Sequence, residues 1–183
     1  PEHFSPFRAS SPLETSVARK VWDTLTCYHP EEQTAEPLIA ESWEFSDEDK
    51  TLTFKIDPEA EFADGSKIVS SDAAASLRYA VALGPANPMA GQFFTYLGDY
   101  VKGARAFWKG DSEEITGIET PDSSTLVIRM NAPNRIFPLA LSAVNFSIVP
   151  EEWVERNIAA AAYRRVGIGD GRDRSVRTAR LGM

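Results

Sequence analysis

The sequence predicts an α+β fold, with helices packed on a small mixed or antiparallel sheet. Three observations lead to this class. Two stretches, residues 42–56 and 115–130, alternate apolar and polar side chains on either side of a turn, which is typical of half-buried antiparallel hairpins. Between them, residues 70–83 carry apolar side chains at helical spacing. We therefore expect one sheet built from two hairpins, with the intervening helix lying across it.

The first hairpin is the clearest local signal. Its apolar residues alternate on either side of the acidic run 47–49: Trp43, Phe45, Leu52, Phe54 and Ile56. We expect one face of this hairpin, including Trp43, to pack and the other to face water. The acidic run lacks the glycine and final glutamate of a twelve-residue calcium loop, so we interpret it as a solvated turn.

The second hairpin is predicted around the turn at residues 121–124, where Pro, Asp and two Ser follow one another. Its apolar residues lie on both sides of that turn: Ile115, Ile118, Leu126, Ile128 and Met130. The helix between the hairpins is expected to begin with Ser70 or Ser71 as its cap and to end at Gly84.

Further elements are expected along the rest of the chain. The spacing predicts one or two short helices within residues 88–108, a short helix at 133–141, a strand at 145–149 and a helix starting at Pro150. After residue 160 the composition changes: the last 23 residues carry six Arg and two Asp, a net +4 against -12 for the remainder. We expect the ordered unit to end near residue 160.

The composition excludes several classes of protein. The net charge of -8 and the isoelectric point near 4.8 argue against a nucleic-acid partner, which requires clustered Lys and Arg. No apolar stretch reaches the roughly 18 to 20 residues that a membrane helix needs. The single Cys27 rules out an internal disulfide and a cysteine-cluster metal site. The first ten residues lack the pattern of a signal peptide, so either export is absent or a leader has been removed.

Several short motifs, taken in order, resemble one known family. They are the stretches Val21–Leu25, Pro37–Trp43, Leu52–Ile56, Glu61–Ser66, Asp72, Ile118–Asp122, Leu126–Ile128 and Phe146–Pro150. Each is weak alone, but their order and spacing resemble the family 5 extracellular solute-binding proteins of ABC transporters. Members of that family bind oligopeptides, dipeptides, nickel complexes and some sugars.

The resemblance implies a partial periplasmic-binding-protein-like fold of type II, the peptide-binding type, and an amino-terminal fragment of a longer protein. It implies part of a first lobe domain at residues 1–40 and a small second domain with a return segment at 41–160. Residues 161–183 depart from the family pattern and are expected to be a disordered or non-family basic tail. A reading-frame error, a natural truncation or a vector-derived tail would each produce this break, and a reading-frame error is the hypothesis that we favour.

The function that the resemblance implies is noncovalent capture. The chain would belong to the substrate-binding component of an ABC importer, taking up a peptide or similar small ligand and delivering it to a membrane permease. The protein would be periplasmic or extracellular and associated with the membrane through its transporter. No cofactor, metal, catalytic residue or nucleic-acid partner is expected.

The ligand site is expected in the first residues, since the comparable stretch of the family lines the binding cleft. The expected ligand-binding residues are Phe4, Ser5, Phe7 and Arg8. Exposed aromatic rings there would suit an extended ligand. The alternative, that Phe4 and Phe7 only anchor the terminus, stays open.

Two other functions are alternatives for this sequence. A small enzyme would use cleft carboxylates such as Asp23 or Asp64, which would have to converge in one pocket with shifted pKa values. A structural interaction module would expose a large apolar patch without a pocket. His3 and His29 have no carboxylate or second histidine at helical i+4 spacing, so they are interpreted as surface or loop residues.

Overall fold

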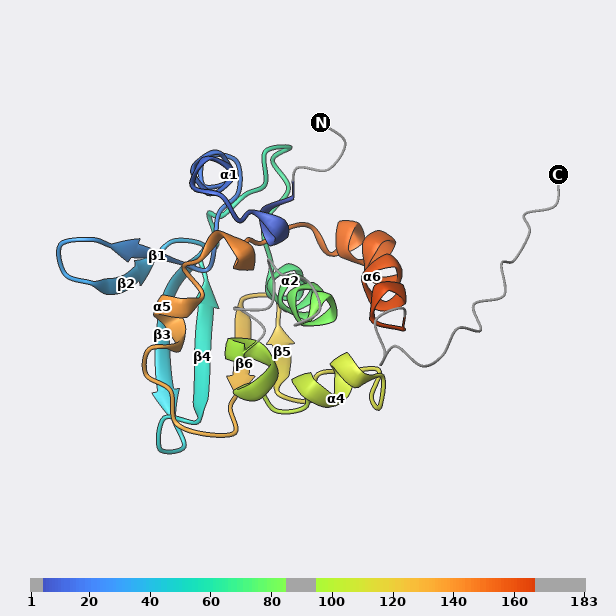
Figure 1. The fold of residues 1–183 in the computed structure, drawn as a ribbon. Coiled ribbons are helices and arrows are strands. Elements are labelled where there is room, and N and C mark those ends of the chain that lie inside the picture. The colour runs from blue at the N-terminus through green and yellow to red at the C-terminus, as the bar shows by residue number, and fades with distance from the viewer. Residues whose placement is uncertain (1–4, 85–94, 167–183) are drawn as a thin grey trace, which may run out of the picture.

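The two predicted hairpins join into one sheet in the computed structural model, which describes residues 5–84 and 95–166 (Figure 1). All pairs in this four-stranded sheet are antiparallel. Its strands, in spatial order, are β3 (Ala40–Ser46), β4 (Thr51–Ile56), β6 (Thr125–Arg129) and β5 (Ile118–Asp122). The predicted α+β class is confirmed.

The β3–β4 hairpin has the register that the alternation predicts. Trp43 lies opposite Phe54, with their ring centroids 6.0 Å apart, and Phe45 lies opposite Leu52. Phe54 and Leu52 are fully buried, whereas Trp43 is half-buried against the same core. Residues 47–49 form the turn, and all three have positive φ.

The β5–β6 hairpin turns at Ser123 and Ser124, and the strand β5 already includes Pro121 and Asp122. A proline has no backbone N–H, so a strand tolerates it at the edge of a sheet, where β5 lies. Ser124 N and Oγ both donate to Asp122 Oδ1 at 2.8 Å, which closes the turn.

The helix α2 (Ser70–Leu83) lies across the sheet as predicted, but its cap differs from the prediction. Asp72 Oδ2 accepts a hydrogen bond from Val69 N at 3.0 Å, so the carboxylate and not a serine satisfies the first turn. Ser70 Oγ instead donates to Asp122 O at 2.5 Å. The prediction of a Ser70 or Ser71 cap is therefore wrong, because the Ser70 hydroxyl is used to attach the helix to β5.

The helix α6 (Glu151–Val166) packs beside α2, and its acidic first turn follows Pro150 as predicted (Figure 1). It continues beyond residue 160, where the sequence indicated the end of the ordered unit, and Ala161 is only 3% exposed. Alanine is the strongest helix former, so the run 159–162 extends the helix. Residues 167–183 of the predicted tail lie outside the described residues.

A second, separate hairpin precedes the sheet. It consists of β1 (Thr26–His29) and β2 (Thr34–Pro37) and projects from the body of the molecule (Figure 1). Short helical elements complete the fold: η1 (Pro6–Arg8), α1 (Pro12–Ala18), the π-helical turn η2 (Thr95–Asp99), α4 (Ala104–Lys109), α5 (Phe137–Ala140) and η3 (Val144–Phe146). η2 and α4 agree with the short helices expected within 88–108, of which residues 88–94 lie outside the described part of the chain.

The strand predicted at residues 145–149 is absent from the described structure. Its first residues belong to η3, and the rest is an irregular buried segment. Ile148 N donates to Asp23 O at 2.9 Å and Val149 N donates to Ser76 Oγ at 3.0 Å. The apolar run resembled a strand because it is buried, but its backbone bonds to a loop and a side chain instead of a neighbouring strand.

Candidate functional site

The first described residues pack into the core of the molecule through Phe7. Phe7, in η1, is 1% exposed, and its ring meets Tyr79 edge-on at 4.9 Å and stacks with Trp153 at 6.1 Å between centroids. The ring therefore packs between α2 and α6. Of the two alternatives left open for Phe7, this placement favours the anchor, and Phe4 lies outside the described residues.

Ser5 and Arg8 flank this buried ring. Within the described chain, Ser5 Oγ is buried without a hydrogen-bond partner and Arg8 forms no ion pair. The two residues are linked by the bond from Arg8 N to Ser5 O, at 3.0 Å. Both are partly buried, so a hydroxyl and a guanidinium at this place can offer hydrogen bonds to a polar or anionic group.

The segment that follows is fixed by a capping box at the start of α1. Ser10 N, Ser10 Oγ and Ser11 N donate to Glu14 Oε2 at 3.0, 3.1 and 3.0 Å, and Ser11 Oγ accepts from Glu14 N at 3.2 Å. The backbone bond from Ser11, with the bonds from Ser10, lowers the pKa of Glu14 to about 2. This carboxylate is therefore ionised and held against the backbone of Ser10 and Ser11 at the start of α1.

The return segment, residues 137–149, packs against these first residues although it lies more than a hundred positions away. Asn145 Nδ2 donates to Ala9 O at 3.2 Å, and Thr26 Oγ1 donates to Pro138 O at 2.7 Å. Both bonds are buried. The chain thus leaves the amino-terminal segment, builds the sheet and comes back to the same place.

Two neighbouring hollows share Arg78 as a common wall. One, of about 280 Å³, lies between α2 and β5 and includes Glu114 and Glu151; the other, of about 390 Å³, includes Glu113 and Glu155. Arg78 pairs with Glu155, and its Nε is buried without a partner among the described residues. Carboxylates outnumber cationic side chains in the lining of both hollows, so each hollow favours a cationic ligand group over an anionic one.

The carboxylates proposed for an enzyme do not meet in either hollow. Asp23 and Asp64 are exposed. The Ser66 hydroxyl and amide donate to Asp64 at 2.6 and 2.9 Å and lower its pKa, which stabilises the ionised form. Both bonds lie within the turn around Gly65, so the role that they support for Asp64 is to hold this turn.

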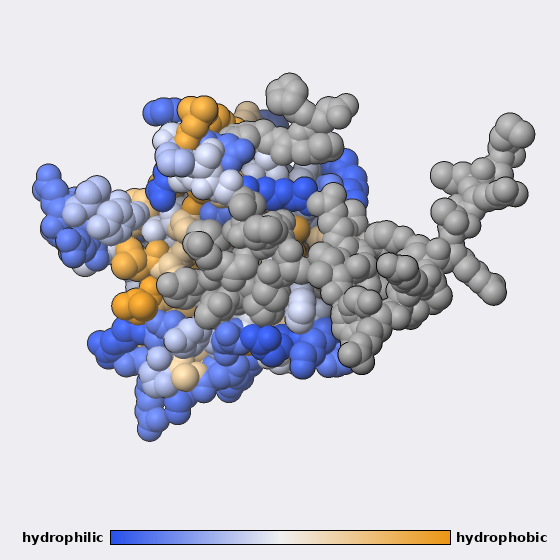
Figure 2. Space-filling model, viewed as in Figure 1, coloured by the Kyte–Doolittle hydropathy of each residue, from blue (hydrophilic) through white to orange (hydrophobic). Residues whose placement is uncertain are grey.

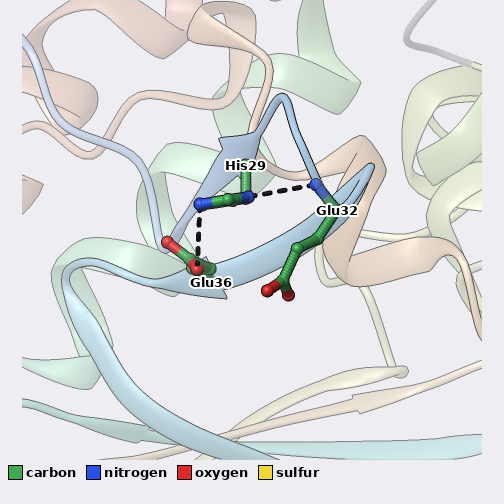
Figure 3. Close-up of side chains that lie close together, drawn as sticks. All are labelled: His29, Glu32 and Glu36. Carbon is green, nitrogen blue, oxygen red and sulfur yellow. Dashed lines mark hydrogen bonds and ion pairs between the residues drawn. The ribbon is translucent and has the colours of Figure 1, made fainter.

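The β1–β2 hairpin brings together a group that the sequence analysis missed. One ligand atom from each of His29, Glu32 and Glu36 lies within 4.8 Å of the others (Figure 3). The three residues stand at i, i+3 and i+7 around a hairpin turn, a spacing that differs from the helical i+4 spacing of a metal-binding helix. The available signal was a histidine before a Pro-Glu-Glu turn with another glutamate on the returning strand.

Exposed apolar side chains gather along α1 and the turn after it. Leu13 is 75% exposed, and Val17 and Val21 follow at four-residue spacing. Figure 2 shows apolar side chains at the upper edge of the molecule, where α1 lies in Figure 1. This face has the spacing of an amphipathic stripe without a partner in the described structure. No helix of the described residues is long and apolar enough to span a membrane.

Comparison with known proteins identifies relatives of the chain. Residues 34–171 match the family described as bacterial extracellular solute-binding proteins, family 5, middle part. The dipeptide-binding protein DppE of Bacillus subtilis is 25% identical over 138 residues, which are 74% of this chain and 24% of that protein.

Solved structures share the fold. The oligopeptide-binding protein OppA of Haemophilus influenzae, in complex with the peptide RPPGFSPFR, has a TM-score of 0.71 at 24% identity, covering 85% of this chain and 30% of its own. The binding protein AgaA of A. tumefaciens R10, in complex with agropinic acid, has a TM-score of 0.66 at 25% identity, covering 86% and 28%. The chain therefore spans about a quarter to a third of the length of these relatives.

Proposed function

Since the chain belongs to the family 5 bacterial extracellular solute-binding proteins, we propose that it is part of the substrate-binding component of an ABC importer. The observation that carries this proposal is the family match over residues 34–171, together with the fold shared with solved binding proteins. Within this proposal the protein captures its ligand by noncovalent contacts and carries out no chemistry. The dispersed Asp23 and Asp64 support that reading, since an enzyme would need them in one cleft.

The proposed ligand is a peptide. A dipeptide-binding protein and an oligopeptide-binding protein are among the relatives, and the agropinic-acid complex of AgaA marks the alternative of another small acid. We propose that Ser5 and Arg8, with Phe4, contribute to the ligand site from this part of the protein. Arg8 is partly buried, and its guanidinium suits a carboxylate, which peptides and agropinic acid both carry.

The proposed organisation follows the path of the chain. Residues 1–40 would belong to the first lobe domain, and the four-stranded sheet with α2 and the return segment would belong to the small second domain at 41–160. The part of the relatives that this chain does not cover would correspond to the opposing lobe. Ligand capture would close the two lobes around the ligand. The proposed partner is a membrane permease, to which the protein delivers its ligand. The proposed location is periplasmic or extracellular, outside the cytoplasmic membrane.

The proposal is tested by calorimetric titration of the complete protein, purified without bound ligand. We expect dipeptides or longer peptides to bind with 1:1 stoichiometry and agropinic acid to bind more weakly or not at all. Arg8→Ala should weaken peptide binding at least tenfold, whereas Arg19→Ala, an exposed arginine just after α1, should leave it unchanged. Turnover of the peptide during the titration, or no binding of any peptide or of agropinic acid, would overturn the proposed function.

A further inference from the structure

The turn of the β1–β2 hairpin places three potential metal ligands on one side. In the antiparallel register His29 lies opposite Thr34 and Cys27 lies opposite Glu36. Because side chains alternate between faces, His29 and Glu36 project from the same face as diagonal neighbours. The register therefore places the imidazole near the Glu36 carboxylate.

The loop supplies the third residue. Gln33 N donates to His29 O at 2.8 Å, and Gln33 adopts φ 57°, so the loop folds back over the end of β1. Glu32 N donates to His29 Nδ1 at 3.1 Å, which leaves Nε2 facing Glu36 Oε1 at 3.8 Å. Figure 3 shows the carboxylates of Glu32 and Glu36 on the same side of the imidazole ring.

The ligand atoms lie farther apart than they would around a bound ion, but on the same side of the hairpin. Ligand atoms about 2.0 to 2.2 Å from a zinc ion in tetrahedral geometry lie roughly 3.3 Å from one another. The three ligand atoms here are within 4.8 Å of each other, so binding an ion requires rotamer changes that draw them together by up to about 1.5 Å. The side chains of His29 and Glu36 are 30% and 45% exposed, which leaves room for such changes. An imidazole with two carboxylates suits zinc and similar divalent transition metals, whereas calcium and magnesium prefer oxygen ligands alone.

We propose that the β1–β2 hairpin binds a zinc-class divalent ion through His29 Nε2 and the carboxylates of Glu32 and Glu36. Three protein ligands leave a fourth position open to water or to a donor group from another molecule. The site lies on a hairpin that projects from the body of the molecule, and it stands independently of the proposed ligand capture.

Binding changes the tautomer of His29. In the metal-free hairpin Nδ1 accepts from Glu32 N, so the neutral ring carries its proton on Nε2. Coordination through Nε2 moves that proton to Nδ1 and removes the bond from Glu32 N. This gives a signal that charge attraction to surface glutamates alone would not produce: a shift of the Glu32 amide resonance together with the His29 ring resonances.

The test is a titration of the complete chain, carrying Cys27→Ser to exclude the thiol, with ZnCl₂ in a non-chelating buffer. We expect one site per chain with the Glu32 amide shift, and at least a tenfold loss of affinity in His29→Gln and in Glu36→Gln. Glu31→Gln is the matched control: Glu31 is an exposed glutamate in the same loop but outside the group, and its loss should leave the affinity unchanged.

Three results would overturn the site. His29→Gln binding zinc as tightly as the parent would remove the histidine from it. Equal losses in Glu31→Gln and Glu36→Gln would reduce it to general attraction by an acidic surface. No 1:1 binding at 100-fold excess of zinc over about 10 μM protein would exclude a site of useful affinity. Circular dichroism of each variant controls for folding.

Discussion

At the scale of single residues, Asp72 connects two helices through one carboxylate. Oδ2 accepts from Val69 N at the start of α2, and Oδ1 accepts from Glu151 N at the start of α6, at 2.8 Å. The side chain is 7% exposed, so water does not readily replace either bond. The sequence resemblance placed Asp72 at a helix start, but its second partner, 79 positions later, depends on the tertiary fold.

Replacement of Asp72 should therefore remove a capping hydrogen bond from the start of each of the two helices. We expect Asp72→Ala to lower the free energy of unfolding by about 2 kcal/mol, since each lost cap costs about 1 kcal/mol. Asp72→Asn keeps one carbonyl acceptor and should recover about half of that loss. Urea denaturation followed by circular dichroism measures both, and equal stability of the three proteins would show that the carboxylate holds neither helix.

The turn at residues 47–49 predicts a stabilising substitution. Glu48 has φ 55°, a left-handed conformation that costs an L-residue about 1 kcal/mol, and its ion pair with Lys50 is exposed. Glu48→Gly should therefore raise the free energy of unfolding by about 0.5 to 1 kcal/mol. Asp47→Gly is the comparison: it also removes the bond from Thr51 Oγ1 to Asp47 Oδ2, at 2.5 Å, and should show no gain. An increase in the free energy of unfolding in Asp47→Gly but not in Glu48→Gly would contradict this explanation.

The lowered pKa of Glu14 predicts how stability depends on pH. The unfolded chain titrates near 4.5 and the folded chain at about 2, so the contribution is present above 4.5 and is lost as pH falls toward 2. Glu14→Gln should therefore be less stable than the parent at pH 6, with the difference vanishing near pH 2. Urea unfolding at intervals between these values measures it. If the stability difference between the parent and Glu14→Gln stays constant with pH, ionisation of Glu14 does not contribute to stability.

At the scale of elements, local patterns predicted the hairpins but not the partners of irregular backbone. Alternation around the acidic turn and around Ser123 identified both hairpins of the sheet, because a half-buried strand leaves that pattern in the sequence. Residues 145–149 are apolar for another reason: they lie buried beside α2 and the loop at Asp23. Periodicity over five residues does not separate these two cases.

Ser76 supplies the hydrogen bonds that stabilise this irregular segment in place of a neighbouring strand. Its hydroxyl accepts from Val149 N at 3.0 Å and donates to Val149 O at 3.2 Å, and the residue is buried. Ser76→Ala should lower the free energy of unfolding by about 1 to 3 kcal/mol, because buried backbone groups lose their partner. Ser71→Ala, at a half-buried position of the same helix, should stay within about 0.5 kcal/mol. Equal effects in chemical denaturation would contradict a special role of Ser76.

At the scale of the whole molecule, the described chain shares a main hydrophobic core from Phe7 to Ala161. The predicted domain division assigns residues 1–40 to the first lobe domain, and Phe7 of this segment packs against Tyr79 of α2 and Trp153 of α6. Sequence patterns did not reveal this contact, because a short segment of Ser, Pro and aromatic residues has no periodicity. The same limit applies to the candidate sites, since Ser5, Arg8 and the His29 group are placed by long-range packing and by hairpin register.

This shared core predicts a single unfolding transition. Phe7→Ala should lower the free energy of unfolding by about 3 to 5 kcal/mol, the usual cost of emptying a large core site. Tryptophan fluorescence and circular dichroism should report the same midpoint in the parent and in the variant. A main transition that is unchanged by Phe7→Ala would mean that the amino-terminal segment folds as a separate unit.

The strand order has a consequence for synthesis on the ribosome. The strand β4 is central, but its partner β6 begins about 70 residues later in the chain. At about 5 to 20 residues per second, one edge of the nascent β3–β4 hairpin stays unpaired for roughly 4 to 14 seconds. That edge presents free backbone groups next to Leu52 and Phe54, a surface on which nascent chains can pair with each other. Chaperone binding during this interval would protect the half-made sheet until Thr125–Arg129 emerges.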